Sequence, residues 1–349
     1  MHNATVIQGF RVLDFGIFDH LDASGAPLAP FFEDRLRLIA LAERAGFTGY
    51  HLAEHHSTPL GTAGSPAVFL AAAIQRTSTI RLGALVHVMP LYHPLRLYEE
   101  ICMLDHLSGG RIMLGVGRGG ALEEHRRFGV APEDASPLNH EAFAVLMQAF
   151  DSDVVNFEGR HFAFKDYVVT LKPAQRPHPP LWYGAPSAEA IVWAVPKAMN
   201  VVSLGPAARA AEIAARYRKE WAALGRAEAD LPRIGITRHV VIAATDDAAR
   251  QIARRAYARW IDAMTYIWRR GGIAFPLADI YPQDWDALET IGHGVAGSPD
   301  TVAAYLDDLE RQTGINYVLC QTTFGDMSFA EASAALDLFG REIAPRFKR

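Results

Sequence analysis

Three consecutive residues that can accept or carry protons, Glu54-His55-His56, stand at the end of a predicted strand over residues 49–55. Neighbouring side chains of a strand point to opposite faces, so at most one of the two histidines can face a site at the strand end. A histidine there could act as a general base, because its ordinary pKa lies near neutral pH. The alternative is a structural pair that is hydrogen-bonded to Glu54 and nearby backbone.

Other histidines near strand ends raise the possibility of a metal site. His20, His51 and His87 could join His55 as ligands. Barrel hydrolases that bind zinc usually carry His-x-His on the first strand and further ligands later, whereas the first strand here offers only Asp19-His20. We therefore expect no metal.

The stretch Gly115-Val-Gly-Arg-Gly-Gly120 formally matches the pattern G-x-G-x-x-G. A dinucleotide-binding fingerprint should open a long helix, but the stretch after Gly120 is short and is stopped by Pro132. We reject that interpretation and expect a tight strand exit where backbone approaches a ligand. Arg118 would then bind phosphate, since a guanidinium suits that group, and a surface ion pair is the alternative.

A second phosphate-binding feature is predicted at Gly184-Ala-Pro-Ser187, where Ser187 opens a helix. Backbone N–H groups at a helix start and a hydroxyl can hold an anion, although a serine there can also be a simple N-cap. Arg118 and Ser187 would follow neighbouring strands. Together they predict the phosphate of a mononucleotide between strands four and five.

Short apolar runs rich in β-branched and aromatic residues alternate along the chain with helical patterns. Eight strands are predicted over residues 12–18, 49–55, 81–88, 112–117, 181–185, 200–204, 234–243 and 315–321. Helices are predicted over residues 31–45, 66–76, 94–107, 138–152, 207–224, 246–263 and 328–343, with others opening at Ser187 and after Ser298. Gly46 is predicted to end the first helix in a left-handed conformation. This order predicts a (β/α)8 TIM barrel, with a doubly wound open sheet as the alternative.

The barrel is expected to be a single domain over residues 1–349 with two departures from the alternation. Residues 156–180 contain four prolines and β-like residues, which predicts an inserted hairpin and loop. Residues 265–295 are rich in Gly, Pro, Trp and Tyr. Active sites of such barrels lie at the carboxyl ends of the strands, where the residues named above are expected.

Composition excludes several classes of protein. Lys and Arg total 34 and Asp and Glu total 39, a net charge of −5, so nucleic acid is not an expected partner. The apolar runs are too short to span a membrane, and residues 1–10 do not resemble a signal peptide. The two cysteines, Cys102 and Cys320, lie in apolar runs and are expected to be inert core residues. We expect a soluble, cytoplasmic protein.

In its ordered motifs the chain resembles the bacterial luciferase-like, flavin-dependent monooxygenases. Ala53-Glu-His-His56 followed by Gly64-Ser-Pro66 is similar to the strand-two signature of that family. Similar blocks follow at Leu82-Gly-Ala-Leu-Val86, Ser108-Gly-Gly-Arg111 with Gly115 to Gly119, and Gly297-Ser-Pro299 with Thr313-Gly-Ile315. The resemblance runs from the first strand to the last helix.

The resemblance implies roles for individual residues. His55 matches the family's catalytic histidine, and Arg118 matches the arginine that binds the FMN phosphate. Leu85-Val86 matches a place where the family often has a non-prolyl cis peptide beneath the flavin ring. The strand-five turn that holds the phosphate and ribityl chain corresponds to Gly184, Pro186, Ser187 and Ala188, with Pro186 where luciferases have Glu. Gly117 stands where luciferases have a reactive cysteine.

The resemblance also implies a two-component reaction. A separate NAD(P)H:flavin reductase would supply reduced FMN (FMNH2), which activates O2 toward a small, apolar organic substrate. Residues 265–295 would form a lid in which Trp268, Tyr281 and Trp285 either cover the flavin or pack in the core. A homodimer is implied as well. The alternatives are an F420-dependent oxidoreductase of the same fold and a flavin-binding barrel without turnover.

Overall fold

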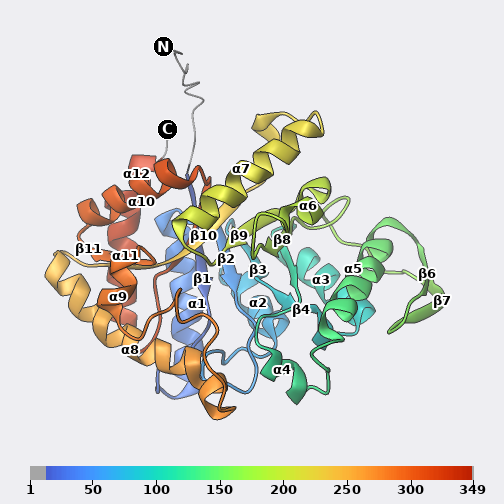
Figure 1. The fold of residues 1–349 in the computed structure, drawn as a ribbon, viewed down its shortest axis with the longest axis horizontal. Helices are drawn as coiled ribbons and strands as arrows, with labels where there is room; N and C mark the ends of the chain where they lie inside the picture. The colour runs from blue at the N-terminus through green and yellow to red at the C-terminus, as the bar shows by residue number, and fades with distance from the viewer. Residues whose placement is uncertain (1–12, 348–349) are drawn as a thin grey trace.

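The computed structural model describes residues 13–347. Val12, at the start of the first predicted strand, and the segment of residues 1–10 lie outside the described residues. Within residues 13–347, parallel strands form the centre of the molecule and helices surround them (Figure 1). No helix in this range has both the length and the apolar character needed to cross a membrane.

The strands follow one another around the centre in the order β3, β2, β1, β12, β10, β9, β8, β5 and β4. Their bounds are β1 Asp14–Asp19, β2 Gly49–Leu52, β3 Arg81–Ala84, β4 His87–Val88, β5 Leu114–Gly117, β8 Leu181–Gly184, β9 Asn200–Ser203, β10 Ile234–Ile242 and β12 Tyr317–Gln321. The ring closes because β4 pairs with β5 and Leu82 bridges to Ile112. We call each strand position around the ring a stave, and β3 and β4 are two parts of one stave. Residues 13–347 therefore form eight staves, which confirms the (β/α)8 barrel and excludes the open sheet.

Within residues 13–347, eight long helices connect the staves, with no long helix after β8 and two between β10 and β12. They are α1 Leu28–Ala45, α2 Pro66–Ile74, α3 Pro94–Ser108, α5 Ala135–Asp151, α7 Ala207–Ala223, α8 Asp246–Arg270, α10 Pro299–Thr313 and α11 Phe329–Leu338. Gly46 ends α1 with φ 95°, as predicted, and Gly314 ends α10 in the same left-handed region. The chain continues after α11 as a π-helix, η4 Phe339–Ile343, and α12 Ala344–Phe347.

Short helices lie in the connections. They are α4 Leu122–Arg127, α6 Ile191–Ala194, α9 Trp285–Thr290 and the 3₁₀ turns η1 Met89–Leu91, η2 Val195–Lys197 and η3 Glu228–Asp230. The sequence analysis missed α4, because six residues are too few to show helical periodicity.

Two boundary predictions were wrong. The helix predicted to end at residue 263 continues to Arg270, because Thr265–Arg270 contains no helix breaker and Gly271-Gly272 supplies the first one. The expected irregular segment 265–295 therefore begins as helix, and it ends in an additional strand. That strand, β11 Gly294–Gly297, pairs in parallel with β10.

The insertion after α5 contains an antiparallel hairpin of β6 Val154–Glu158 and β7 Ala163–Val168. It projects from the barrel beside α5, at the right of Figure 1. A loop then returns the chain to β8, and Gln175 anchors it by hydrogen bonds from its backbone N–H and side-chain amide to Asp105.

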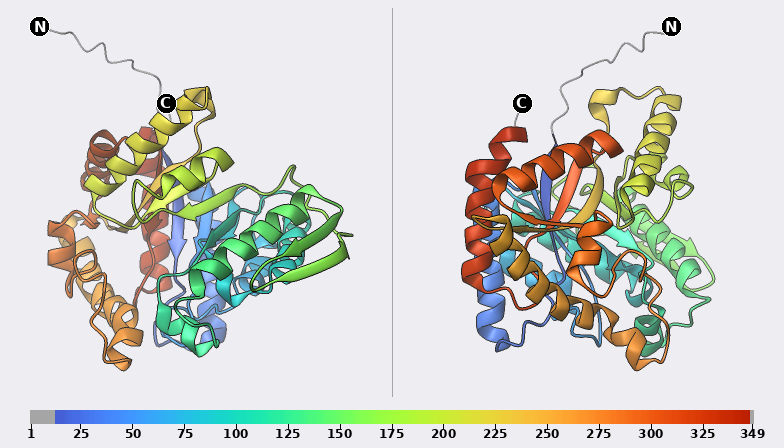
Figure 2. Two further views of the ribbon diagram at one scale, coloured as in Figure 1. Left: turned by 45° about the vertical axis from the view of Figure 1, so that its right-hand side comes forward. Right: turned by 60° about the vertical axis from the view of Figure 1, so that its left-hand side comes forward.

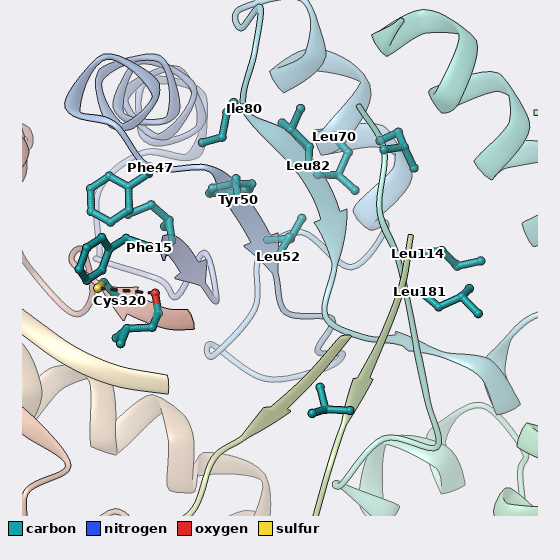
Figure 3. Close-up of a cluster of buried hydrophobic side chains, with 14 of the residues drawn as sticks. Phe15, Phe47, Tyr50, Leu52, Leu70, Ile80, Leu82, Leu114, Leu181 and Cys320 are labelled. Atoms are coloured by element: carbon teal, nitrogen blue, oxygen red, sulfur yellow. Dashed lines mark hydrogen bonds between the residues drawn. The ribbon is translucent and has the colours of Figure 1, made fainter. Parts of the chain in front are cut away.

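Apolar side chains fill the space between the staves and the helices, and a second apolar cluster fills the barrel itself. Figure 3 shows part of the first region, where Phe15, Phe47 and Cys320 lie together beside β1. Cys102 and Cys320 are both buried and form no disulfide, and burial raises the pKa of the Cys102 thiol to about 11. Both cysteines are therefore core residues, as expected.

Candidate active site

The carboxyl ends of the staves form one rim of the barrel, which we call the carboxyl-end rim. In Figure 2, α4 (green) and α8 with the segment that follows it (orange) lie toward the end to which β1 points. The start of α4 contacts the end of α8 there, since Ala121 packs with Ile267, Trp268 and Phe275. These elements surround the residues that the sequence analysis selected.

The imidazole of His55 is hydrogen-bonded to a carboxylate on α4, in the segment that follows β5. Its Nδ1 lies 3.0 Å from Oε1 of Glu124 on α4. The Glu124 side chain is 5% exposed, whereas that of His55 is 22% exposed. An ionised carboxylate only accepts hydrogen bonds, so Nδ1 donates and a neutral ring has an unprotonated Nε2. Within residues 13–347, Nε2 has no hydrogen-bond partner, which leaves it available as a base.

His20, at the end of β1, lies against His55. The two rings are stacked with their centroids 5.5 Å apart and their planes 20° apart. Burial, and after it the nearby His55, His239 and Arg35, lowers the pKa of His20 well below its usual range. His20 is therefore a neutral ring at neutral pH.

The remaining members of the Glu-His-His motif form a separate network. Nε2 of His56 lies 2.9 Å from Oε1 of Glu54. The other carboxylate oxygen of Glu54 accepts from the backbone N–H of Val88 at 3.2 Å and from the Tyr92 hydroxyl at 2.8 Å. Burial would lower the pKa of His56, but the hydrogen bond and charge of Glu54 outweigh it and raise that pKa. His56 thus has the structural arrangement considered above, with its ring bonded to Glu54, whereas the ring of His55 is bonded to Glu124 instead.

An apolar cluster lies inside the barrel beneath this rim. Leu85 and Val86, between β3 and β4, pack with it, and the peptide bond between them is cis. The other members, contributed by staves around the ring, are Phe18, Ala53, Met113, Trp182, Val202, Tyr317 and Leu319. Leu85 and Val86 thus belong to the apolar surface inside the barrel beneath the carboxyl-end rim.

The first two glycines of the G-x-G pattern, Gly115 and Gly117, make room for this segment. A Cβ on Gly115 would collide with the carbonyl oxygen of Ala84 and lie 3.2 Å from Cα of Leu85. A Cβ on Gly117 would lie 2.7 Å from Cγ2 of Val86. Gly115 and Gly117 therefore allow close packing between β5 and the segment that joins β3 to β4. At Gly120, in contrast, an added Cβ would meet nothing within 4 Å.

Arg118 follows β5 and is exposed. Its carbonyl accepts from Nε2 of His125 on α4 at 2.7 Å, but its guanidinium makes no ion pair with any residue in the range 13–347. The guanidinium lies close enough to Tyr183 on β8 to oppose the rise that burial causes in the pKa of that hydroxyl. The ion pair considered as an alternative is thus not found, and the cation stands next to the end of β8.

The turn after β8 brings Gly184, Pro186, Ser187 and Ala188 to the same rim, because β5 and β8 are paired in parallel with Val116 opposite Tyr183. The prediction that Ser187 opens a helix is wrong: the residues after it form a turn, and α6 begins at Ile191. The Ser187 hydroxyl bonds to Glu189 and holds the pKa of that exposed carboxyl below its usual range. A Cβ on Gly184 would meet nothing within 4 Å, so the turn is open at that point.

The aromatic residues of segment 265–295 are mainly packed. Tyr281 and Trp285 are buried in a cluster with Tyr257 and Trp260 of α8 and Phe324, around the ring of His239. Trp268 packs against Phe275. Of this cluster, Trp260 reaches the site residues, because its ring lies 5.7 Å from that of His20.

The sequence analysis missed Glu124 and Gln321, whose side-chain amide nitrogen lies 3.0 Å from Nδ1 of His20. A signal for Glu124 was present in the charged run Glu123-Glu-His-Arg-Arg127 directly after the Arg118 motif. Nothing in the local sequence marks Gln321. Within residues 13–347, no group of three or more His, Cys, Asp or Glu side chains is arranged to hold a metal ion.

The model of the luciferase-like monooxygenase family matches residues 13–317. An uncharacterised protein, y4wF, of Sinorhizobium fredii is 39% identical over 315 residues, which cover 90% of this chain and 92% of that protein. The oxygenase component of the flavin-dependent trigonelline monooxygenase of Acinetobacter baylyi is 24% identical, covering 95% of each chain. Limonene 1,2-monooxygenase of Rhodococcus erythropolis is 34% identical over 47% of this chain and 43% of its own length.

Solved structures share the fold. Monooxygenase RslO1 of Streptomyces bottropensis has a TM-score of 0.85 at 24% identity, covering 96% of this chain and all of that one. The oxygenating constituent of 3,6-diketocamphane monooxygenase of Pseudomonas putida, in complex with FMN, has a TM-score of 0.80 at 19% identity, covering 96% and 99%. The F420-dependent tetrahydromethanopterin reductase of Methanopyrus kandleri has a TM-score of 0.71 at 22% identity, covering 97% and 100%.

Proposed function

Because the chain belongs to the luciferase-like monooxygenase family, we propose that it is the oxygenase of a two-component system that uses reduced FMN and O2 to oxidise a small, apolar organic substrate. A separate NAD(P)H:flavin reductase would be its partner, as the name of the trigonelline relative, an oxygenase component, suggests. Reduced FMN, when bound, would supply the activation of O2.

The observation that carries the proposal is an unpaired cation beside an open turn. Within residues 13–347 the guanidinium of Arg118 has no ionic partner, and β5 and β8 are neighbours. A phosphate fits these groups, since a guanidinium and backbone N–H groups are common phosphate ligands. Arg118 would bind the phosphate, and Gly184, Pro186, Ser187 and Ala188 would line its other side. Glu189, which is hydrogen-bonded by the Ser187 hydroxyl, would be an unfavourable neighbour of the phosphate.

Other residues of the carboxyl-end rim suit three further requirements of the reaction: support for the flavin ring, a proton acceptor and the exclusion of water. Leu85 and Val86 would support the apolar flavin ring. His55, with Nδ1 held by Glu124, would accept a proton at Nε2. The segment from the end of α8 through α9 would help to exclude water, which a reaction with activated oxygen requires. The cytoplasm, where reduced flavin is produced, would be the compartment.

The cofactor is tested by binding. We expect the protein to bind FMN and FMNH2 more tightly than F420, whereas micromolar binding of F420 without flavin binding would favour an F420-dependent oxidoreductase. That alternative is considered because the Methanopyrus kandleri reductase shares the fold.

The role of Arg118 is tested by comparing FMN with riboflavin, which lacks the phosphate. Arg118→Ala should weaken FMN binding by about tenfold or more, the typical effect of losing a charge-assisted hydrogen bond, and leave riboflavin binding nearly unchanged. Arg127→Ala, which removes an exposed arginine of α4, is the matched control. Equal losses for the two ligands would contradict the phosphate role.

A further inference from the structure

The hydrogen bond between Gln321 and His20 determines which nitrogen of His20 has the proton. Nε2 of Gln321 lies 3.0 Å from Nδ1 of His20. An amide nitrogen can only donate, so Nδ1 is the acceptor. A neutral imidazole has one protonated nitrogen, and in His20 that nitrogen is therefore Nε2.

The orientation of the Gln321 amide supports this assignment. Its Oε1 is buried and has no hydrogen-bond partner. Reversing the amide would place the NH2 group at that position, and a buried donor without a partner is rarer in proteins than a buried carbonyl without one.

Nε2 of His20 is a free donor on the carboxyl-end rim. Within residues 13–347 it has no hydrogen-bond partner, yet it is not one of the buried polar atoms that lack one, so it retains some exposure. Aromatic rings surround the imidazole: Phe18 at 4.9 Å, His55 at 5.5 Å and Trp260 at 5.7 Å between ring centroids. An unpaired donor in apolar surroundings favours a ligand with an acceptor oxygen.

We propose that His20 is a substrate-binding residue whose Nε2–H donates a hydrogen bond to a neutral acceptor oxygen of the organic substrate, an oxygen for which a ketone carbonyl serves as the probe. This inference rests on the proposed function. His20 and His55 then have opposite roles, because Glu124 leaves Nε2 of His55 as an acceptor whereas Gln321 leaves Nε2 of His20 as a donor.

The same contacts disfavour three other classes of substrate, namely hydrocarbons, carboxylates and cations. A hydrocarbon would leave the donor unpaired, which costs affinity. A carboxylate would require a charged partner, but burial keeps His20 neutral and Arg118 is assigned to the cofactor phosphate. Glu54 and Glu124 are both occupied by histidines and offer no site for a cationic substrate.

The test compares ketones with isosteres in which a CH2 group replaces the carbonyl oxygen. Cyclohexanone with methylenecyclohexane, and 2-decanone with 2-methyl-1-decene, are titrated by calorimetry in the presence and in the absence of FMN. We expect at least one ketone to bind the wild-type protein about tenfold more tightly than its isostere, the size of one hydrogen bond. His20→Phe should bring the ratio to about one without weakening the binding of the alkene.

Further variants distinguish the loss of the hydrogen-bond donor from a general disturbance of the fold. His20→Gln retains a donor and should keep part of the preference, whereas His20→Met should not; this pair decides the question if His20→Phe does not fold. His239→Phe, which removes another buried imidazole, should leave the ratio unchanged.

FMN affinity is measured separately, so a wild-type protein that fails to bind flavin contradicts the proposed function and not the role of His20. A ratio near one in the wild type, no ketone binding, or a preference that survives in both His20→Phe and His20→Met would overturn the inference.

Discussion

Glu124 is a positioning residue for His55, because it holds Nδ1 at 3.0 Å and leaves Nε2 free. Replacing it by glutamine keeps an acceptor but removes the charge that stabilises a protonated ring. The adjacent Glu123 instead pairs with Arg126 on the outside of α4. The two glutamates therefore form a natural pair of test and control.

We expect His55→Ala to lower product formed per FMNH2 consumed by at least about tenfold, with FMNH2 binding retained, since general acid–base groups contribute that much or more. Glu124→Gln should lower it by roughly tenfold and Glu123→Gln should not change it. In the His55→Ala background, Glu124→Gln should have little further effect, because the two residues act together. Product would be measured with a panel of aldehydes and ketones, and additive losses in the double variant would argue against the pairing.

Asp22 gives a pH dependence of stability. Burial raises its pKa from 3.8 to about 6, although Arg35 and the N–H of Gly325 oppose the rise. Because the folded-state pKa is the higher one, the folded protein binds the proton more tightly. The contribution of Asp22 to the free energy of unfolding is complete below about pH 4. It decreases as the pH rises toward 6, by up to about 3 kcal/mol.

Asp22→Asn should therefore gain stability relative to the wild type as the pH rises from about 4 to 6. The difference in melting temperature between the two proteins, measured across this range, tests the expectation. Asp34→Asn, on the exposed face of α1, is the control and should show little such trend. A constant difference for Asp22→Asn would show that its pKa is not raised.

At the scale of the element, the tight contact between β5 and the segment joining β3 to β4 gives Gly115 a structural role. Gly115→Ala places a methyl group against backbone that cannot move without disturbing two staves. We expect a loss of about 2 kcal/mol or more in the free energy of unfolding, since forced overpacking typically costs 1–3 kcal/mol. Gly120→Ala, where the methyl group meets nothing, should change it by less than about 0.5 kcal/mol in urea unfolding. Equal effects would refute the packing role.

The predictions at this scale succeeded where a pattern is local. Alternating apolar runs predicted the staves, and Gly46 predicted the end of α1. They failed at Ser187, where a helix N-cap was expected and a turn is found, because a serine after Pro186 suits either structure. They also failed at residues 265–270, where the aromatic residues that suggested a loop instead continue α8.

At the scale of the whole molecule, we propose that the protein is a homodimer. Apolar side chains on α2 and α3 remain exposed: Val68 is 72% exposed, Met103 57% and Leu107 54%. Met103 and Leu107 are four residues apart and so lie on one face of α3. A second copy of the chain would bury them.

Sedimentation equilibrium should give about twice the chain mass of 38.3 kDa. The double substitution Met103→Glu and Leu107→Glu should yield a monomer, because charged groups cannot be buried unpaired at an apolar contact. Leu224→Glu, at an exposed apolar position after α7, is the control. A wild-type monomer would contradict the proposal.

The amino-acid sequence by itself determined the barrel, the end of the molecule where its site would lie, and the candidates His55 and Arg118, because these follow from periodicity and from motifs within short stretches. Only the tertiary structure decided their partners. Glu124 lies 69 residues from His55 along the chain, and Gln321 lies 301 residues from His20. The closing of the ring brings these side chains together, and no local pattern specifies which residues of separate staves will meet.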